Sequence, residues 1–173
     1  QAKDVIGISL LPALKQLFSI HDEKTAMDLI YTYKKKFSEH AQISSPLYNG
    51  AIELLEKLKQ RGYILAVATG KGRQGLEHNW HHSNTKHFFS ASRTADDAQS
   101  KPSPDMLQQL LFELNLSADQ VLMVGDTTYD MAMAESINMD RIGVSFGVHS
   151  VDTLQIHKPL AVIDALDELL LHV

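Results

Sequence analysis

The chain has 173 residues, of which 44% are hydrophobic and 21% are charged, as in an ordinary globular domain. It has 16 Lys and Arg against 21 Asp and Glu, a net charge of −5, and no basic block suited to nucleic-acid phosphates. Cysteine is absent, which excludes disulfides and Cys-ligated zinc and fits a reducing compartment. No apolar run approaches the roughly 20 residues that span a bilayer. We therefore expect a cytoplasmic protein without nucleic-acid or membrane partners.

The first 45 residues are predicted to be helical. Asp22 is suited to cap a helix N-terminus, and apolar residues recur at helical spacing after it. The lysine run at 34–36 falls on the other face, which we interpret as solvated. Ser44-Ser45-Pro46 breaks the helical pattern. Because the chain opens with Gln1 rather than Met, we expect further sequence upstream.

From residue 46 onward, predicted helices and strands alternate. A helix after residue 50 ends near Gly62, and the apolar run 64–68 is typical of a strand buried on both faces. Ser103 and Pro104 predict a helix start, and Asn115 ends that helix. The alternation predicts the α/β class, a three-layer, doubly wound, mostly parallel sheet with helices on both faces. The other predicted strands lie near residues 88–89, 121–124, 141–144 and 161–163, and residues 166–170 form a terminal helix.

Polar residues follow two of these strands, where parallel sheets bind ligands. Thr69-Gly70-Lys71 offers a hydroxyl and a glycine amide for a phosphate oxygen. Gly125-Asp126-Thr127-Thr128-Tyr129-Asp130 offers carboxylates, which suit the hard cation Mg²⁺. Lys101, in the stiff loop Ser100-Lys101-Pro102-Ser103-Pro104, can neutralise phosphate charge. Each signal alone is weak, but their order and spacing together indicate a site for a phosphorylated ligand.

These three segments resemble motifs two, three and four of the haloacid dehalogenase superfamily, and most of all its phosphoglycolate phosphatase-like branch. Leu47-Tyr48-Asn49-Gly50 and Gly143-Val144-Ser145-Phe146-Gly147 are also similar to family segments, so the resemblance covers residues 47–173. It implies a Rossmannoid core at residues 46–173, lacking its first strand, and a partial helical cap at residues 1–45.

The resemblance also implies residue roles. Thr69 and the Gly70 backbone would bind the transferred phosphoryl group, and Lys101 would stabilise the nucleophile and the phosphate charge. Asp126 would bind Mg²⁺, and Asp130 would belong to the metal site as a supporting residue, acting on Asp126 or Lys101 from the metal side. The hydroxyls of residues 127 and 128 would either help there or cap the next helix.

The first family motif, Asp-x-Asp-x-Thr, is absent from this chain. It carries the nucleophile and the general acid/base, so we expect the 173 residues alone to be inactive. The full-length product would be a Mg²⁺-dependent phosphatase that hydrolyses a small phosphate monoester through an aspartyl-phosphate. Two alternatives stay open: a mutase or dehalogenase of the same fold, and a non-catalytic shortened protein that binds a phosphorylated ligand or partner.

The absent motif belongs to a strand that lies between the other two motif-bearing strands in the family. The strands at 64–68 and 121–124 should therefore lie about 9–10 Å apart with an empty lane between them. Direct pairing of these two strands would favour the non-catalytic alternative.

Four histidines, His78, His81, His82 and His87, form a second group, called here the histidine cluster. Their spacing could present a transition-metal site on one helical face. Because no cysteine completes a ligand set, we interpret the cluster as a polar helix face and expect no metal there.

Overall fold

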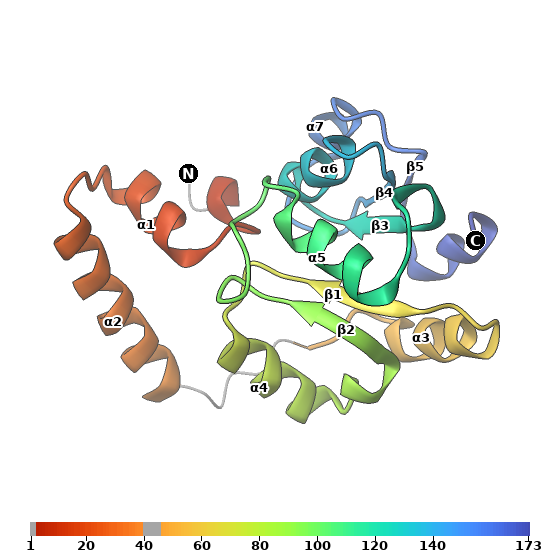
Figure 1. The fold of residues 1–173 in the computed structure, drawn as a ribbon, viewed down its shortest axis with the longest axis horizontal. Coiled ribbons are helices and arrows are strands. Elements are labelled where there is room, and N and C mark those ends of the chain that lie inside the picture. The colour runs from red at the N-terminus through yellow and green to blue at the C-terminus, as the bar shows by residue number, and fades with distance from the viewer. Residues whose placement is uncertain (1–2, 40–45) are drawn as a thin grey trace.

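The computed structural model describes residues 3–39 and 46–173. Its N-terminal part contains a 3-10 turn η1 (Lys3–Val5) and helices α1 (Leu10–Phe18) and α2 (Glu23–Glu39), which pack on each other at one side of the molecule (Figure 1). The prediction that this part is helical is confirmed over α1 and α2, which are separated by a short break, and residues 40–45 of the predicted stretch lie outside the described residues. Ser19 takes a left-handed conformation (φ 50°) that ends α1. The Asp22 carboxylate then accepts the Thr25 N–H at 2.7 Å, which confirms Asp22 as a helix cap.

The rest of the chain alternates helices and strands, and every strand pair is parallel, which confirms the α/β class. The order is α3 (Ala51–Gln60), β1 (Leu65–Ala68), α4 (Arg73–Ser83), η2 (Lys86–Phe88), β2 (Phe89–Arg93), α5 (Asp105–Leu114), η3 (Ala118–Gln120), β3 (Leu122–Gly125), α6 (Thr128–Glu135), β4 (Asp140–Val144), α7 (Val151–Gln155), β5 (Ala161–Ile163) and η4 (Leu166–Leu171). In the described part of the chain, no helix is both long and apolar enough to cross a membrane.

The helix ends predicted at Gly62 and Asn115 are confirmed, whereas Ser103, predicted as a helix cap, lies one residue before the N-cap of α5. Gly62 has φ +87° just after the C-cap of α3, a conformation that costs glycine little. Asn115 has φ +54° as the C-cap of α5. At its other end α5 begins at Asp105, directly after Pro104, whose backbone is already helical.

The strands form two sheets, one with the order β1-β2 and one with the order β3-β4-β5. Within residues 46–173 no strand pairing joins β1 to β3, so the direct pairing of these two strands does not occur. Ala66, in the middle of β1, is exposed, although strands of such sheets are normally covered on both faces. An exposed β1 next to an unpaired edge agrees with a lane between β1 and β3, and the width of that lane stays a prediction.

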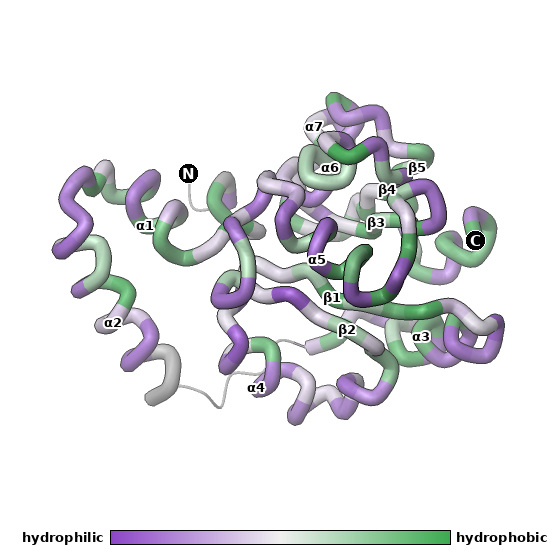
Figure 2. Tube along the Cα trace, in the orientation of Figure 1, coloured by the Kyte–Doolittle hydropathy of each residue, from purple (hydrophilic) through white to green (hydrophobic). Residues whose placement is uncertain are grey.

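Two groups of apolar side chains form the core. One joins α3 and η4 to β4 and β5, with Leu65 of β1 and Val124 of β3 packed against it. The other joins α5 to α6 and is rich in methionine, with Met106, Met133 and Met139 almost fully buried. Figure 2 shows hydrophobic residues along β1. Ala68, at the carboxyl end of β1, and Met123 of β3 pack against the second group, so the core supports the strand ends that precede the predicted site residues.

Candidate active site

Thr69 and Asp126 each follow the carboxyl end of a strand. The Thr69 N–H donates to the Arg93 carbonyl at 3.0 Å, extending the β1–β2 ladder by one residue, and its hydroxyl accepts the Lys71 N–H at 3.2 Å. Asp126 Oδ2 accepts the Val148 N–H at 3.0 Å. The two loops therefore present a hydroxyl and a carboxylate from β1 and β3, as the sequence predicts.

Lys101 connects the two loops. Its Nζ donates to the Ala68 carbonyl at the end of β1 at 3.0 Å and to Asp130 Oδ1 on α6 at 2.6 Å. Both charged side chains are 6% exposed. A charge-assisted hydrogen bond shielded from water in this way holds the ammonium group in one position.

Asp130 is fully committed to this arrangement. Its Oδ2 accepts the Thr127 N–H at 3.1 Å and the Thr127 hydroxyl at 2.7 Å, which makes a capping box at the start of α6. Of the two partners predicted for Asp130, the structure pairs it with Lys101. Of the two roles left open for Thr127, the structure shows the capping role.

Two glycines allow close backbone approaches at the site. A Cβ on Gly147 would lie 2.1 Å from the Cβ of Asp126, so only glycine lets the loop after β4 lie against the Asp126 side chain. A Cβ on Gly70 would lie 2.6 Å from the Gly7 carbonyl oxygen and 2.8 Å from that of Ile8. The site is therefore enclosed by backbone from three parts of the chain.

Sequence reasoning missed the part played by residues 7–9. Gly7 (φ +108°) lies against the Thr127 side chain, and its carbonyl faces Gly70, so this segment connects the β1 and β3 sides of the site. The Ser9 N–H donates to Ser100 Oγ at 2.9 Å, next to Lys101, and Ser9 Oγ is buried without a hydrogen-bond partner. The only signal in the sequence was a glycine inside a stretch predicted as helix.

The fit to Mg²⁺ depends on Asp126. Mg²⁺ is commonly held by one or two carboxylates together with waters and substrate phosphate, and Asp126 supplies one such carboxylate. Both Asp130 oxygens accept hydrogen bonds instead, and over residues 3–39 and 46–173 no group of three or more His, Asp or Glu side chains is arranged around a metal position. The described residues thus supply one carboxylate ligand for Mg²⁺, and the remaining ligands must come from other groups.

The histidine cluster lies mainly on α4. His82 Nδ1 lies 2.8 Å from the His78 carbonyl oxygen, and the two rings lie 4.1 Å apart. The His87 ring instead packs on Phe88. Trp80, between these histidines in sequence, is buried and stacks on Phe89 at 5.9 Å, so it is a core contact. The absence of a bound metal in the cluster stays a prediction.

With this geometry in place, comparison with known proteins gives the family. The family described as haloacid dehalogenase-like hydrolase matches residues 1–144 of the chain. The chain belongs to this family. The dehalogenase-like fold, inferred above from three motifs, is therefore confirmed, and the chain is a hydrolase of this superfamily.

Individual relatives of this hydrolase are described as phosphatases. A pyrophosphatase PpaX from Bacillus cereus (strain B4264) is 30% identical over 160 residues, 92% of this chain and 74% of the relative. The crystal structure of a predicted phosphatase from Clostridium acetobutylicum superposes with a TM-score of 0.87 at 27% identity, covering 96% of this chain and 79% of that one. A predicted phosphoglycolate phosphatase from Haemophilus somnus 129pt shares the fold, with a TM-score of 0.82 at 24% identity, covering 99% of this chain and 80% of that one.

Proposed function

We propose that this chain is the phosphate-binding and metal-binding part of a Mg²⁺-dependent phosphatase that hydrolyses a small phosphate monoester through an aspartyl-phosphate. The observation that carries the proposal is the buried Lys101–Asp130 pair, which joins motif three to motif four at the carboxyl ends of β1 and β3. A fixed ammonium group at this position can stabilise charge on a transferring phosphoryl group without reorganising.

The other roles follow from position. The Thr69 hydroxyl and the Gly70 N–H, just past β1, would hold phosphoryl oxygens. Asp126 would hold Mg²⁺, which supplies positive charge to the phosphate oxygens when bound. Asp130 would orient Lys101, since it accepts a hydrogen bond from the ammonium group that also donates to the Ala68 carbonyl. We do not assign Asp130 as a ligand of the metal.

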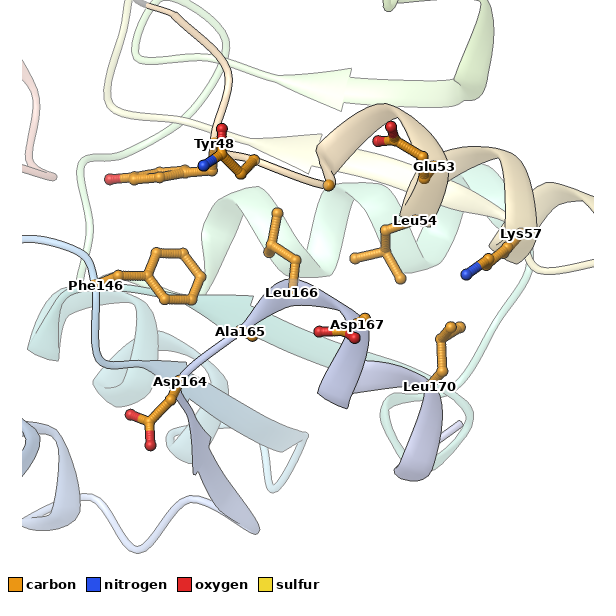
Figure 3. A pocket seen from close by; sticks show the side chains of 12 residues that line it. Tyr48, Glu53, Leu54, Lys57, Phe146, Asp164, Ala165, Leu166, Asp167 and Leu170 are labelled. Carbon is orange, nitrogen blue, oxygen red and sulfur yellow. The ribbon is translucent and has the colours of Figure 1, made fainter.

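The nucleophile would come from a strand that occupies the lane between β1 and β3. Both strands have an edge without a strand partner in the described residues, and Ala66 is exposed. A cavity of about 480 Å³ also lies between α3 and η4, where Leu54, Leu166 and Leu170 face one another (Figure 3). Leu166 and Leu170 pack against the same core group as Leu65 and Val124, so this cavity borders the core that β1 and β3 share. A strand there would pair both edges and bring an Asp-x-Asp pair beside Lys101.

A non-catalytic protein that binds a phosphorylated ligand is the second candidate, because no Asp-x-Asp occurs in the 173 residues. The open edges of β1 and β3 favour the enzyme. A chain that had lost this strand for good would gain by pairing the two edges directly, since each unpaired buried backbone group costs on the order of 1–3 kcal/mol.

The test is phosphate release from a panel of phosphate monoesters and pyrophosphate, with and without Mg²⁺. It compares the 173-residue chain with a chain extended by an upstream strand that carries Asp-x-Asp-x-Thr. We expect turnover only in the extended chain and only with Mg²⁺. In that chain Asp126→Asn should abolish turnover and Lys101→Ala should lower kcat about 10²- to 10³-fold.

Asp119→Asn and Lys59→Ala are matched controls, because they change the same residue types away from the site. Both should keep wild-type kcat/KM. Full activity of the Asp126→Asn variant, or Mg²⁺-dependent turnover by the 173 residues alone, would show that the site assignment is wrong.

A further inference from the structure

A second cavity, called here the distal pocket, has a volume of about 390 Å³ and lies between the N-terminal segment and the start of α6. It is lined by Lys3 of η1, Gln16 of α1, Thr128 and Tyr129 of α6, and His149 with its neighbours in the loop before α7. Seven of its eight lining residues are polar, one is a lysine, and none is a carboxylate. In a chain of net charge −5, a cavity with this lining is suited to an anionic group.

His149 is held in a defined state at the wall of this pocket. Its Nδ1 lies 3.0 Å from the Thr128 backbone nitrogen, and that N–H donates to it. Nδ1 therefore carries the lone pair, and the proton of the neutral ring is on Nε2. The ring also packs beside Tyr129, with ring centroids 6.0 Å apart. The imidazole is thus oriented as a hydrogen-bond donor through Nε2.

The distal pocket shares a wall with the candidate active site. The Val148 N–H donates to Asp126 Oδ2 at 3.0 Å, and the His149 N–H donates to the Asp126 carbonyl at 3.1 Å. Thr128 of the pocket also follows Asp126 by two residues, so the pocket adjoins the candidate active site on the Asp126 side.

We propose that the distal pocket binds a second anionic group, a carboxylate or a phosphate, at the end of the substrate remote from the transferred phosphoryl group. His149 donates its Nε2–H to this group, and Lys3 supplies the positive charge. This inference rests on the proposed function, because it takes the phosphoryl group to lie between Lys101 and Asp126. It makes His149 and Lys3 specificity-determining residues and leaves the chemical step to the site described above.

The test is an NMR titration that follows backbone amides and imidazole nitrogens, on the 173-residue chain and on the extended chain. The two-anion probes are pyrophosphate and 2-phosphoglycolate. Ethyl phosphate, whose tail is uncharged, and inorganic phosphate are the one-anion probes. We expect the two-anion probes to shift the Thr128 amide and the His149 ring signals, and the one-anion probes to leave both unchanged.

Substitutions at His149 separate the role of Nδ1 as a hydrogen-bond acceptor from the role of Nε2 as a hydrogen-bond donor. In His149→Asn the side-chain oxygen replaces Nδ1 as acceptor for the Thr128 N–H, but the Nε2 donor is lost. His149→Gln places an N–H near the position of Nε2. The His149→Asn and Lys3→Met variants should each bind the two-anion probes about tenfold or more weakly, the effect of one hydrogen bond to a charged group, whereas His149→Gln should weaken them less. Lys59→Met, on the exposed face of α3, is the matched control and should change nothing.

The proposed role of the distal pocket would be overturned by equal responses to ethyl phosphate and pyrophosphate. It would also be overturned if the His149→Asn variant bound both two-anion probes with wild-type affinity. Failure of the proposed function has a different signature. In that case no probe shifts the Thr69 and Gly70 amides in the extended chain, whatever happens at Thr128. The amide spectrum of each variant shows whether it is folded, and His149→Gln and Lys3→Met keep the test decisive if His149→Asn is not.

Discussion

Replacing Asp130 by Asn should destabilise the protein strongly. The asparagine oxygen can still accept from Thr127, but its NH₂ group then faces the Lys101 ammonium, where the Asp130 carboxylate lies 2.6 Å from Nζ. With 6% of each side chain exposed, water cannot replace the lost charge. Breaking a buried pair from one side costs about 3–5 kcal/mol. A domain has only about 5–15 kcal/mol of net stability, so this loss is a large part of the total.

The assay is urea unfolding of the chain, followed by far-UV circular dichroism and by fluorescence of the buried Trp80. Lys101→Met should cost less than Asp130→Asn, because the remaining Asp130 carboxylate keeps both hydrogen bonds from Thr127. The double variant should cost less than the sum of the two, by a coupling energy of about 1–3 kcal/mol. The control is Glu77→Gln, which breaks the Lys86–Glu77 pair.

That control pair has a similar length, 2.8 Å, but its side chains are 63% and 43% exposed. It should be worth less than about 1 kcal/mol. If Asp130→Asn cost no more than Glu77→Gln, or if the two single changes added without coupling, the pair would not be shielded from water as the structure shows. The Lys101 ammonium group would then not be held in a fixed position at the site.

Three further outcomes are expected. Gly147→Ala should destabilise the protein by about 1–3 kcal/mol or more, because the added Cβ would lie 2.1 Å from the Asp126 Cβ. Gly75→Ala is the comparison: it lies inside α4, its added Cβ would be 3.8 Å from the nearest atom, and it should stabilise the protein slightly. Equal melting temperatures for the two variants would refute the close approach at Gly147. Burial raises the pKa of Asp97, but hydrogen bonds from the Thr94 hydroxyl and N–H and a neighbouring guanidinium outweigh it, so that the pKa is lowered from 3.8. The stability that Asp97 contributes is therefore present above its unfolded pKa and is lost as pH falls through its lower folded pKa. Urea unfolding at a series of pH values in this range should show a smaller loss of stability for the Thr94→Val variant than for the wild type. Excess Zn²⁺ should leave the melting temperature unchanged, and a saturable rise that vanishes when the histidine cluster is replaced by alanine would contradict the polar-face interpretation.

The sequence alone determined those features that depend on near neighbours along the chain. The apolar runs at 64–68 and 121–124 became β1 and β3 because buried parallel strands need apolar side chains on both faces. Gly62 and Asn115 ended their helices because a left-handed residue is a local steric matter. The placement of Thr69 and Asp126 also followed, since residues just after parallel strands lie at the same edge of the fold.

Only the tertiary structure decided which site residues contact each other. The Lys101–Asp130 bond joins residues 29 apart, the Thr128–His149 bond joins residues 21 apart, and the Ser9–Ser100 bond joins residues 91 apart. Nothing in the local pattern distinguishes Asp126 from Lys101 as the partner of Asp130, because both are compatible with a carboxylate one helical turn past β3. The choice depends on how α5, α6 and the N-terminal segment pack around the strand ends, and packing is set by long-range contacts that a single sequence does not display.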